Sequence, residues 1–179
     1  MNFNDVLTFW FHEIEPKQWW KKDKKFDNLL RCRFLNIHYL SVKSELISWR
    51  ASEKGRLAEI IVIDQFSRNI FRNKPEAFSS DHLALFLSKE MLRLGLYQKF
   101  NKNEKIFAFM PFMHSEIFED QIISLSLYSN LGIKENFRSA LKHFNIIRKF
   151  GRFPHRNKIL SRQSTDEELA FLKTPGSSF

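Results

Sequence analysis

The chain has 179 residues and a formal net charge of +9 at pH 7. This length is typical of one domain, and a hydrophobic content of 43% excludes a disordered chain. No stretch reaches the roughly 18 apolar residues of a membrane span, and the N-terminus lacks the pattern of a signal peptide. The single cysteine, Cys32, favours a reducing compartment. We therefore predict a cytoplasmic protein without a membrane partner, in which Cys32 is buried and inert.

Helical patterns follow one another along the chain, and strand patterns are hard to find. The sequence predicts one all-α domain over residues 1–179, with six to eight helices. A first helix begins near Asn4, and the helix that includes Glu104 is expected to kink or break at Pro111. Thr165 and Glu168 fit a capping box. The other expected helices are Asp27–Trp49, Leu57–Phe71, Leu83–Leu94, Glu104–Leu131, Glu135–Phe150 and Asp166–Leu172.

The helix expected at Leu57–Phe71 carries charges although its apolar residues lie almost all round its axis, as in a buried helix. A buried charge is costly unless it is paired, so we predict an internal ion pair between Asp64 and Arg68. This group is either a structural network or part of a ligand pocket. Glu59 lies on the apolar side, and the sequence does not explain it. The first polar block consists of Asp64, Gln65, Arg68, Asn69 and Arg72.

A second polar block follows Pro111 and includes His114, Glu116 and Asp120. If Ser115 caps the next helix, Glu116 lies in its positive first turn, and Asp120 follows one turn later. The two carboxylates would then point the same way and complement a cationic partner.

The third block is that cationic partner. Residues 136–165 contain eight Lys or Arg and no Asp or Glu, so much of the net charge is concentrated there. Gly151 and Pro154 shape a turn in this stretch. On the preceding helix, His143 lies on the apolar face, where a structural role is commoner than a ligand role. The turn presents Arg152, His155, Arg156 and Asn157.

The three blocks resemble the signature of a bacterial family, the domain of unknown function 924 family. The resemblance also includes Phe9-Trp10-Phe11 and the final Gly-Ser-Ser-Phe, so it extends over nearly the whole chain. It implies an all-helical fold similar to tetratricopeptide-type helical arrays and no established activity. Ser67 and Ser161 depart from the family pattern. The blocks themselves are Asp64–Asn69, Pro111–Glu116 with Asp120–Gln121, and Phe150–Asn157.

We predict first a binding protein with an internal pocket for a small anionic molecule or a peptide. Arginine suits the recognition of carboxylate and phosphate groups, and helical arrays offer concave surfaces. The three blocks, opposite in charge, are expected to meet in space. The candidate ligand-binding residues are Asp64, Gln65, Arg68, Asn69, Arg72, His114, Glu116, Asp120, His143, Arg152, His155, Arg156 and Asn157.

Two other functions stay open. An enzyme of hydrolase or transferase type could use His114 or His155 as a general base beside Glu116, although no catalytic motif accompanies these residues. The spacing of the histidines and acids matches no metal-ligand motif, so no metal and no cofactor is expected. Nucleic acid could bind at Lys17–Lys25, where lysines flank Trp19 and Trp20. The favoured interpretation of that segment is structural: the two rings anchor a loop, and the lysines are solvated.

Overall fold

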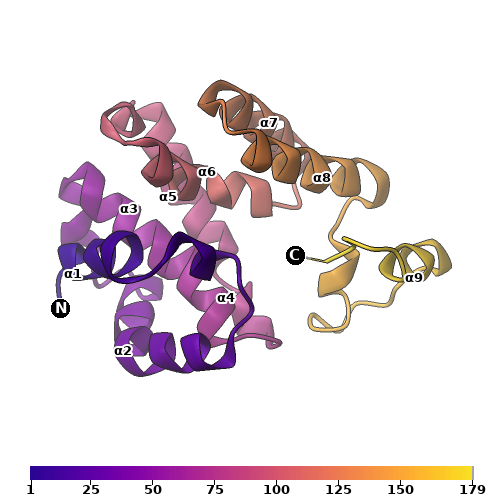
Figure 1. The fold of residues 1–179 in the computed structure, drawn as a ribbon, viewed down its shortest axis with the longest axis horizontal. Helices are drawn as coiled ribbons and strands as arrows, with labels where there is room; N and C mark the ends of the chain where they lie inside the picture. The colour runs from indigo at the N-terminus through magenta and orange to yellow at the C-terminus, as the bar shows by residue number, and fades with distance from the viewer. Residues whose placement is uncertain (179) are drawn as a thin grey trace. The chain divides into compact units, whose positions relative to one another are not determined.

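The computed structural model describes residues 1–178, and every regular element in that range is helical, which confirms the predicted all-α class (Figure 1). No helix of that range is long and apolar enough to cross a membrane. The α-helices are α1 (Phe3–Thr8), α2 (Lys24–Val42), α3 (Glu53–Ile61), α4 (Ser67–Ile70), α5 (Asp81–Arg93), α6 (Lys102–His114), α7 (Phe118–Leu131), α8 (Lys134–Phe150) and α9 (Asp166–Leu172). Short 3-10 or π turns are η1 (Phe9–Glu13), η2 (Pro16–Trp19), η3 (Ile47–Ala51), η4 (Val62–Phe66), η5 (Pro75–Ala77), η6 (Leu96–Lys99) and η7 (Pro154–Arg156).

The residues group into two compact units. The first unit comprises Met1–Arg72 and Glu76–Pro111, and the second comprises Asn73–Pro75 and the residues from Phe112 onward. The organisation as a single domain stays a prediction. Each unit has its own apolar interior.

The first unit is built around aromatic rings that two wide π turns bring together. The η1 and η4 turns meet through Phe9 and Phe66, whose ring centroids lie 6.1 Å apart. Trp10 and Phe34 also contact Phe66, at 5.4 and 4.8 Å between centroids. All four side chains are almost fully buried, so this cluster is a major part of the apolar interior.

The buried helix predicted at Leu57–Phe71 is present as one continuous stretch of α3, η4 and α4. It begins earlier than predicted, because the Ser52 hydroxyl accepts the Gly55 N–H at 3.0 Å and caps α3. Glu59 on this helix is fully buried, and Arg50 donates to both of its carboxylate oxygens at 2.8 and 2.7 Å. That ion pair explains the acid that the sequence left unexplained.

Three sequence predictions about this part of the chain are wrong. The helix expected at Asp27–Trp49 ends at Val42, and η3 follows as a separate turn. Pro111 lies inside α6 and does not break it; the break comes at residues 115–117 instead. Proline lacks only its own N–H, so α6 loses one backbone hydrogen bond at Pro111 and continues to His114. Cys32 is exposed, not buried.

The second unit contains a helical hairpin, in which α7 and α8 pack side by side (Figure 1). Only Gly132 and Ile133 separate these helices, and Gly132 has a φ of 74° that a residue with a side chain rarely adopts. Gly151 ends α8 in the same conformation, as predicted. The capping box of Thr165 and Glu168 at the start of α9 is also confirmed. The hydrophobic cluster of this unit is formed by Ile146, Ile147, Phe150, Phe153 and Phe171.

Candidate functional site

The first polar block lies in the first unit, where the predicted ion pair is confirmed. Arg68 Nη1 is 3.1 Å from Asp64 Oδ1, and Asp64 is fully buried. Arg68 also donates to both carboxylate oxygens of Asp81 at 2.9 Å, a partner that sequence reasoning missed. Burial alone would lower the pKa of Arg68, but the charges of Asp64 and Asp81 outweigh it and raise the pKa. This guanidinium is therefore held between two carboxylates.

The rest of this block connects helices. Arg72 donates to both carboxylate oxygens of Asp27 on α2 at 2.6 Å, and to Asn69 Oδ1 at 2.7 Å. Asn69 Nδ2 donates to the Gln65 carbonyl at 3.0 Å, and Gln65 Nε2 donates to Asp64 Oδ2 at 2.5 Å. These contacts fit the structural alternative for the first block.

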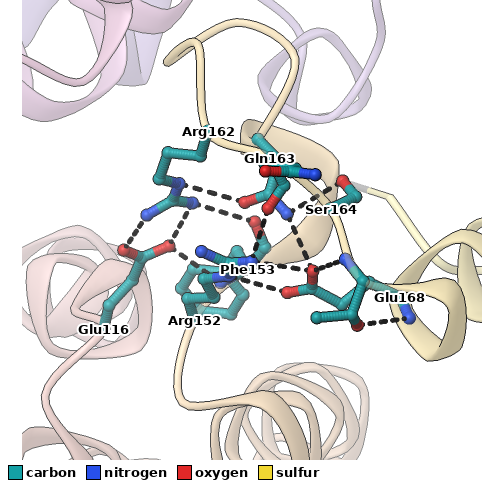
Figure 2. A network of polar contacts seen from close by, with 9 residues as sticks. Glu116, Arg152, Phe153, Arg162, Gln163, Ser164 and Glu168 are labelled. Atoms are coloured by element: carbon teal, nitrogen blue, oxygen red, sulfur yellow. Dashed lines mark hydrogen bonds and ion pairs between the residues drawn. The ribbon is translucent and has the colours of Figure 1, made fainter.

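The second and third blocks come together in the second unit through Glu116. The Glu116 carboxylate accepts the backbone N–H of Phe153 at 2.8 Å and two bonds from the Arg162 guanidinium at 2.7 and 3.0 Å (Figure 2). Burial tends to raise the pKa of Glu116, but the hydrogen bonds from Arg162 and Phe153 and the charge of Arg156 lower it. Glu116 is thus an ionised residue that holds the turn after α8.

A second carboxylate, Glu168 on α9, holds the other side of this turn (Figure 2). Arg152 donates to its two oxygens at 2.7 and 2.8 Å, and Asn157 Nδ2 to its Oε2 at 3.2 Å. The hydrogen bond from Arg152 is the main reason that the pKa of Glu168 falls to about 2. Arg162 Nε donates to Asn157 Oδ1 at 3.0 Å, which links the two carboxylates. We call Glu116, Arg152, Asn157, Arg162 and Glu168 the clasp.

Two members of the clasp, Arg162 and Glu168, were not among the candidate residues from the sequence. A signal for Glu168 was present, since it is the acid of the capping box at Thr165. Arg162 belongs to the acid-free stretch, but nothing in the sequence distinguishes it from its neighbours. Arg152 and Asn157 were predicted to bind a ligand, and the structure gives both of them partners within the protein.

A group of cationic and imidazole side chains surrounds the ring of Phe153, which is fully buried. The Phe153 centroid lies 5.4 Å from His143, 5.7 Å from His155 and 4.6 Å from the Arg156 guanidinium carbon. His114 lies 6.2 Å from His143 between ring centroids, and Arg156 Nη2 donates to the His114 carbonyl at 3.0 Å. We call His114, His143, His155 and Arg156 the histidine cluster.

His143 is held in its neutral form. Its buried Nδ1 lies 2.8 Å from the Ser139 carbonyl, which can only accept, so Nδ1 carries the proton and Nε2 carries the lone pair. Burial lowers the pKa of His143 well below its ordinary value, and the positive charges of His114, Arg156 and His155 lower it further. At neutral pH this imidazole is therefore uncharged, with Nε2 as an acceptor.

The prediction that the two carboxylates of the second block share one helix face is wrong. Glu116 precedes α7, because the helix begins at Phe118. The Ser115 hydroxyl accepts the Ile117 N–H at 3.1 Å and donates to the buried Asp120 at 2.8 Å. Ser115 thus stabilises the segment before α7 and is not its N-cap residue.

The structure therefore brings together the candidates of the second and third blocks within the second unit. The meeting of the first block with them stays a prediction. Within residues 1–178, no group of three or more His, Cys, Asp or Glu side chains is placed to hold a metal ion.

Comparison with known proteins agrees with the resemblance carried by the sequence blocks. The profile of a family described as bacterial proteins of unknown function, DUF924, matches residues 6–176. A solved structure, that of the protein of unknown function ATU0120 from Agrobacterium tumefaciens, is similar with a TM-score of 0.91 and 34% sequence identity. The similarity covers 96% of each chain. No curated protein matches the chain. The matched range, which includes all three blocks, places this chain in the DUF924 family.

Proposed function

We propose that the protein binds a small anionic group at the histidine cluster, as a phosphate or carboxylate of a small molecule or peptide. The observation that supports this proposal is the gathering of three imidazoles and one guanidinium around the ring of Phe153. The charge of Arg156 opposes protonation of the nearby imidazoles, and a bound anion would offset that charge. His114 and His155 are each partly exposed, so they can reach a ligand from solvent.

Arg156 would make the principal contact. Its guanidinium is charged at every physiological pH and offers a planar set of donors that matches a carboxylate or a phosphate. Its Nη2 donates to the His114 carbonyl at 3.0 Å, which fixes the orientation of the guanidinium. The clasp supports this role, because it fixes the backbone on both sides of Arg156 before a ligand arrives.

An enzyme is the second candidate, and the tautomer of His143 favours it. A neutral imidazole with its lone pair at Nε2 is the form that a general base requires. The sequence suggested His114 or His155 as the base. The mechanism proposed from the structure uses His143 as the base, and Arg156 stabilises negative charge. Glu116 was expected to orient the general base. It does not have this role in the mechanism, since its oxygens accept bonds from Arg162 and from the Phe153 N–H.

Thermal denaturation with added anions tests the binding proposal. Phosphate and sulfate, compared with chloride at equal ionic strength, should raise the melting temperature of the wild type, because a ligand of the folded state stabilises it. Arg156→Gln should lose this rise. Arg148→Gln removes the same charge from an exposed position on α8 and should keep it. Equal rises in the wild type and Arg156→Gln would refute the proposal.

Two broader features belong to the same proposal. The α7–α8 hairpin supports a tetratricopeptide-like arrangement of helical pairs, in which concave surfaces bind ligands. A cytoplasmic location suits the exposed thiol of Cys32, which a reducing compartment keeps unoxidised.

A further inference from the structure

A second candidate site lies in the first unit, on the segment that leads into α2. A pocket of about 480 Å³ opens there, within the size range of pockets that bind small ligands. Basic and aromatic side chains share its wall with one acid. The pocket is lined by Lys17, Gln18, Trp20, Lys21, Asp23 and Phe26.

The two tryptophans of this segment differ in their surroundings. Trp19 Nε1 donates to the Trp10 carbonyl at 2.9 Å, and its ring contacts Phe107 at 5.0 Å, which confirms the anchoring role predicted for it. Trp20 stacks on Phe107 at 5.9 Å with an interplanar angle of 12°, yet 54% of it is exposed. Anchoring alone does not explain so much open aromatic surface at the edge of a pocket.

The wall of the pocket is fixed by the protein itself. Phe107, which supports the Trp20 ring, is buried. Asp23 Oδ1 accepts the N–H groups of Phe26 and Lys25 at 3.2 and 2.8 Å, and these bonds lower the pKa of Asp23. Its Oδ2 lies 3.5 Å from Lys21 Nζ. The one acid of the pocket is therefore engaged in capping α2 and does not set the character of the site.

The charge around the pocket indicates an anionic occupant larger than the pocket. Lys17 and Lys21 line it, and three more exposed lysines follow within four residues. These three do not line the pocket, but they extend its positive charge along the chain. A polyanion that continues past the pocket would reach them. The three lysines are Lys22, Lys24 and Lys25.

We propose that this pocket takes one unstacked base of a single-stranded nucleic acid. The base stacks on Trp20, and the lysines contact the phosphates on either side of it. Every base has a π-face, so the site tolerates different sequences. This site is independent of the histidine cluster, because all of its residues belong to the first unit.

Fluorescence anisotropy of a labelled oligothymidylate of roughly twelve nucleotides, with the full chain, tests the proposal. Trp20→Ala should weaken binding about tenfold or more, because base stacking on an aromatic ring contributes on this scale. Trp20→Phe, which keeps an aromatic face, should bind nearly as well as the wild type. The slope of log K against log salt is negative, and the double variant Lys17→Ala/Lys21→Ala should make it shallower by about 1 to 1.4.

The matched control is Lys142→Ala/Lys158→Ala, which removes the same charge from exposed positions in the second unit. It should leave the salt slope unchanged. Equal affinity of Trp20→Ala and the wild type would overturn the proposal. So would a change of the salt slope in the control as large as that in Lys17→Ala/Lys21→Ala. Thymidine monophosphate that competes as well as the oligonucleotide would overturn strand binding. If Trp20→Ala fails to fold by circular dichroism, the exposed lysine pair decides the outcome.

Discussion

The carboxylate of Glu116 accepts the backbone N–H of Phe153 at 2.8 Å, across 37 residues of sequence. This bond joins the segment after α6 to the turn after α8. Because the ring of Phe153 is the centre of the histidine cluster, the position of the cluster depends on this carboxylate. Glu116 was predicted to contact a ligand itself. In the structure it positions the histidine cluster, whose residues would make that contact.

Glu116→Ala should destabilise the protein by about 1.5–3 kcal/mol, the range for hydrogen bonds to charged groups. It leaves Arg162 and the Phe153 N–H without this acceptor. Urea denaturation measures the loss, and Glu119→Ala, an exposed acid on α7, provides the control with little change expected. If both variants unfold at the same urea concentration, the clasp does not contribute to stability.

Asp64→Ala should cost about 3 kcal/mol, at the lower end of the range for breaking a buried ion pair. Arg68 keeps both of its bonds to Asp81, which limits the loss. Chemical denaturation of this variant is compared with Glu45→Ala, which removes an exposed acid from the first unit. A midpoint equal to that of the wild type would mean that the buried Asp64 carboxylate contributes nothing.

The buried pair of Arg50 and Glu59 allows a double-mutant cycle. Arg50→Met should destabilise by about 3–5 kcal/mol, because it leaves the fully buried Glu59 without its cation. The double variant Arg50→Met/Glu59→Leu should recover most of this loss, since no buried charge remains. A double variant less stable than Arg50→Met would contradict this account of the pair.

Stability should fall on mild acidification because of His38. Burial lowers its pKa to about 4 in the folded protein, against 6.5 for the free side chain. Between these pH values the unfolded chain binds the proton more readily, so stability decreases as the pH falls from about 6.5 to 4. The full loss is about 3 kcal/mol and does not grow below that window.

His38→Gln isolates this contribution, because its amide can still donate to the Ser67 hydroxyl that His38 Nε2 contacts at 2.6 Å. Denaturation midpoints at pH 4, 5, 6 and 7 should show a smaller change for the variant. Some dependence should persist, since the pKa of His143 is also lowered by burial. An unchanged pH profile would mean that His38 accepts a proton without loss of stability.

Local signals in the sequence predicted most of the fold. Gly151 ends α8, and the capping box at Thr165 begins α9, because such signals act within a few residues. The break after α6 was misplaced at Pro111, because a proline removes one hydrogen bond of a helix without always ending it. Neither π turn was predicted, because their wide geometry depends on the rings that pack there.

The candidate site was harder to predict, because the charge of a side chain does not indicate which residue it pairs with in the folded protein. The Asp64–Arg68 pair follows from helical spacing, and the structure contains it. Arg68 with Asp81 joins residues 13 apart, and Glu116 with Arg162 joins residues 46 apart. Only the folded chain determines such pairs. For the same reason Arg152 was interpreted as a ligand contact, whereas it holds Glu168.

The π turn at Val62–Phe66 sets the phase between the two ends of this helix. A π turn holds one residue more than an α turn, and it absorbs that residue without changing the direction of the side chains that follow. If the same residues were wound as ordinary α-helix, every later residue would rotate by about 100° relative to α3. Arg68 and Arg72 would then turn away from Asp81 and Asp27 together. The wide turn therefore keeps two ion pairs in phase, and a variant that lacks one residue of the turn should wind as ordinary α-helix and keep both pairs.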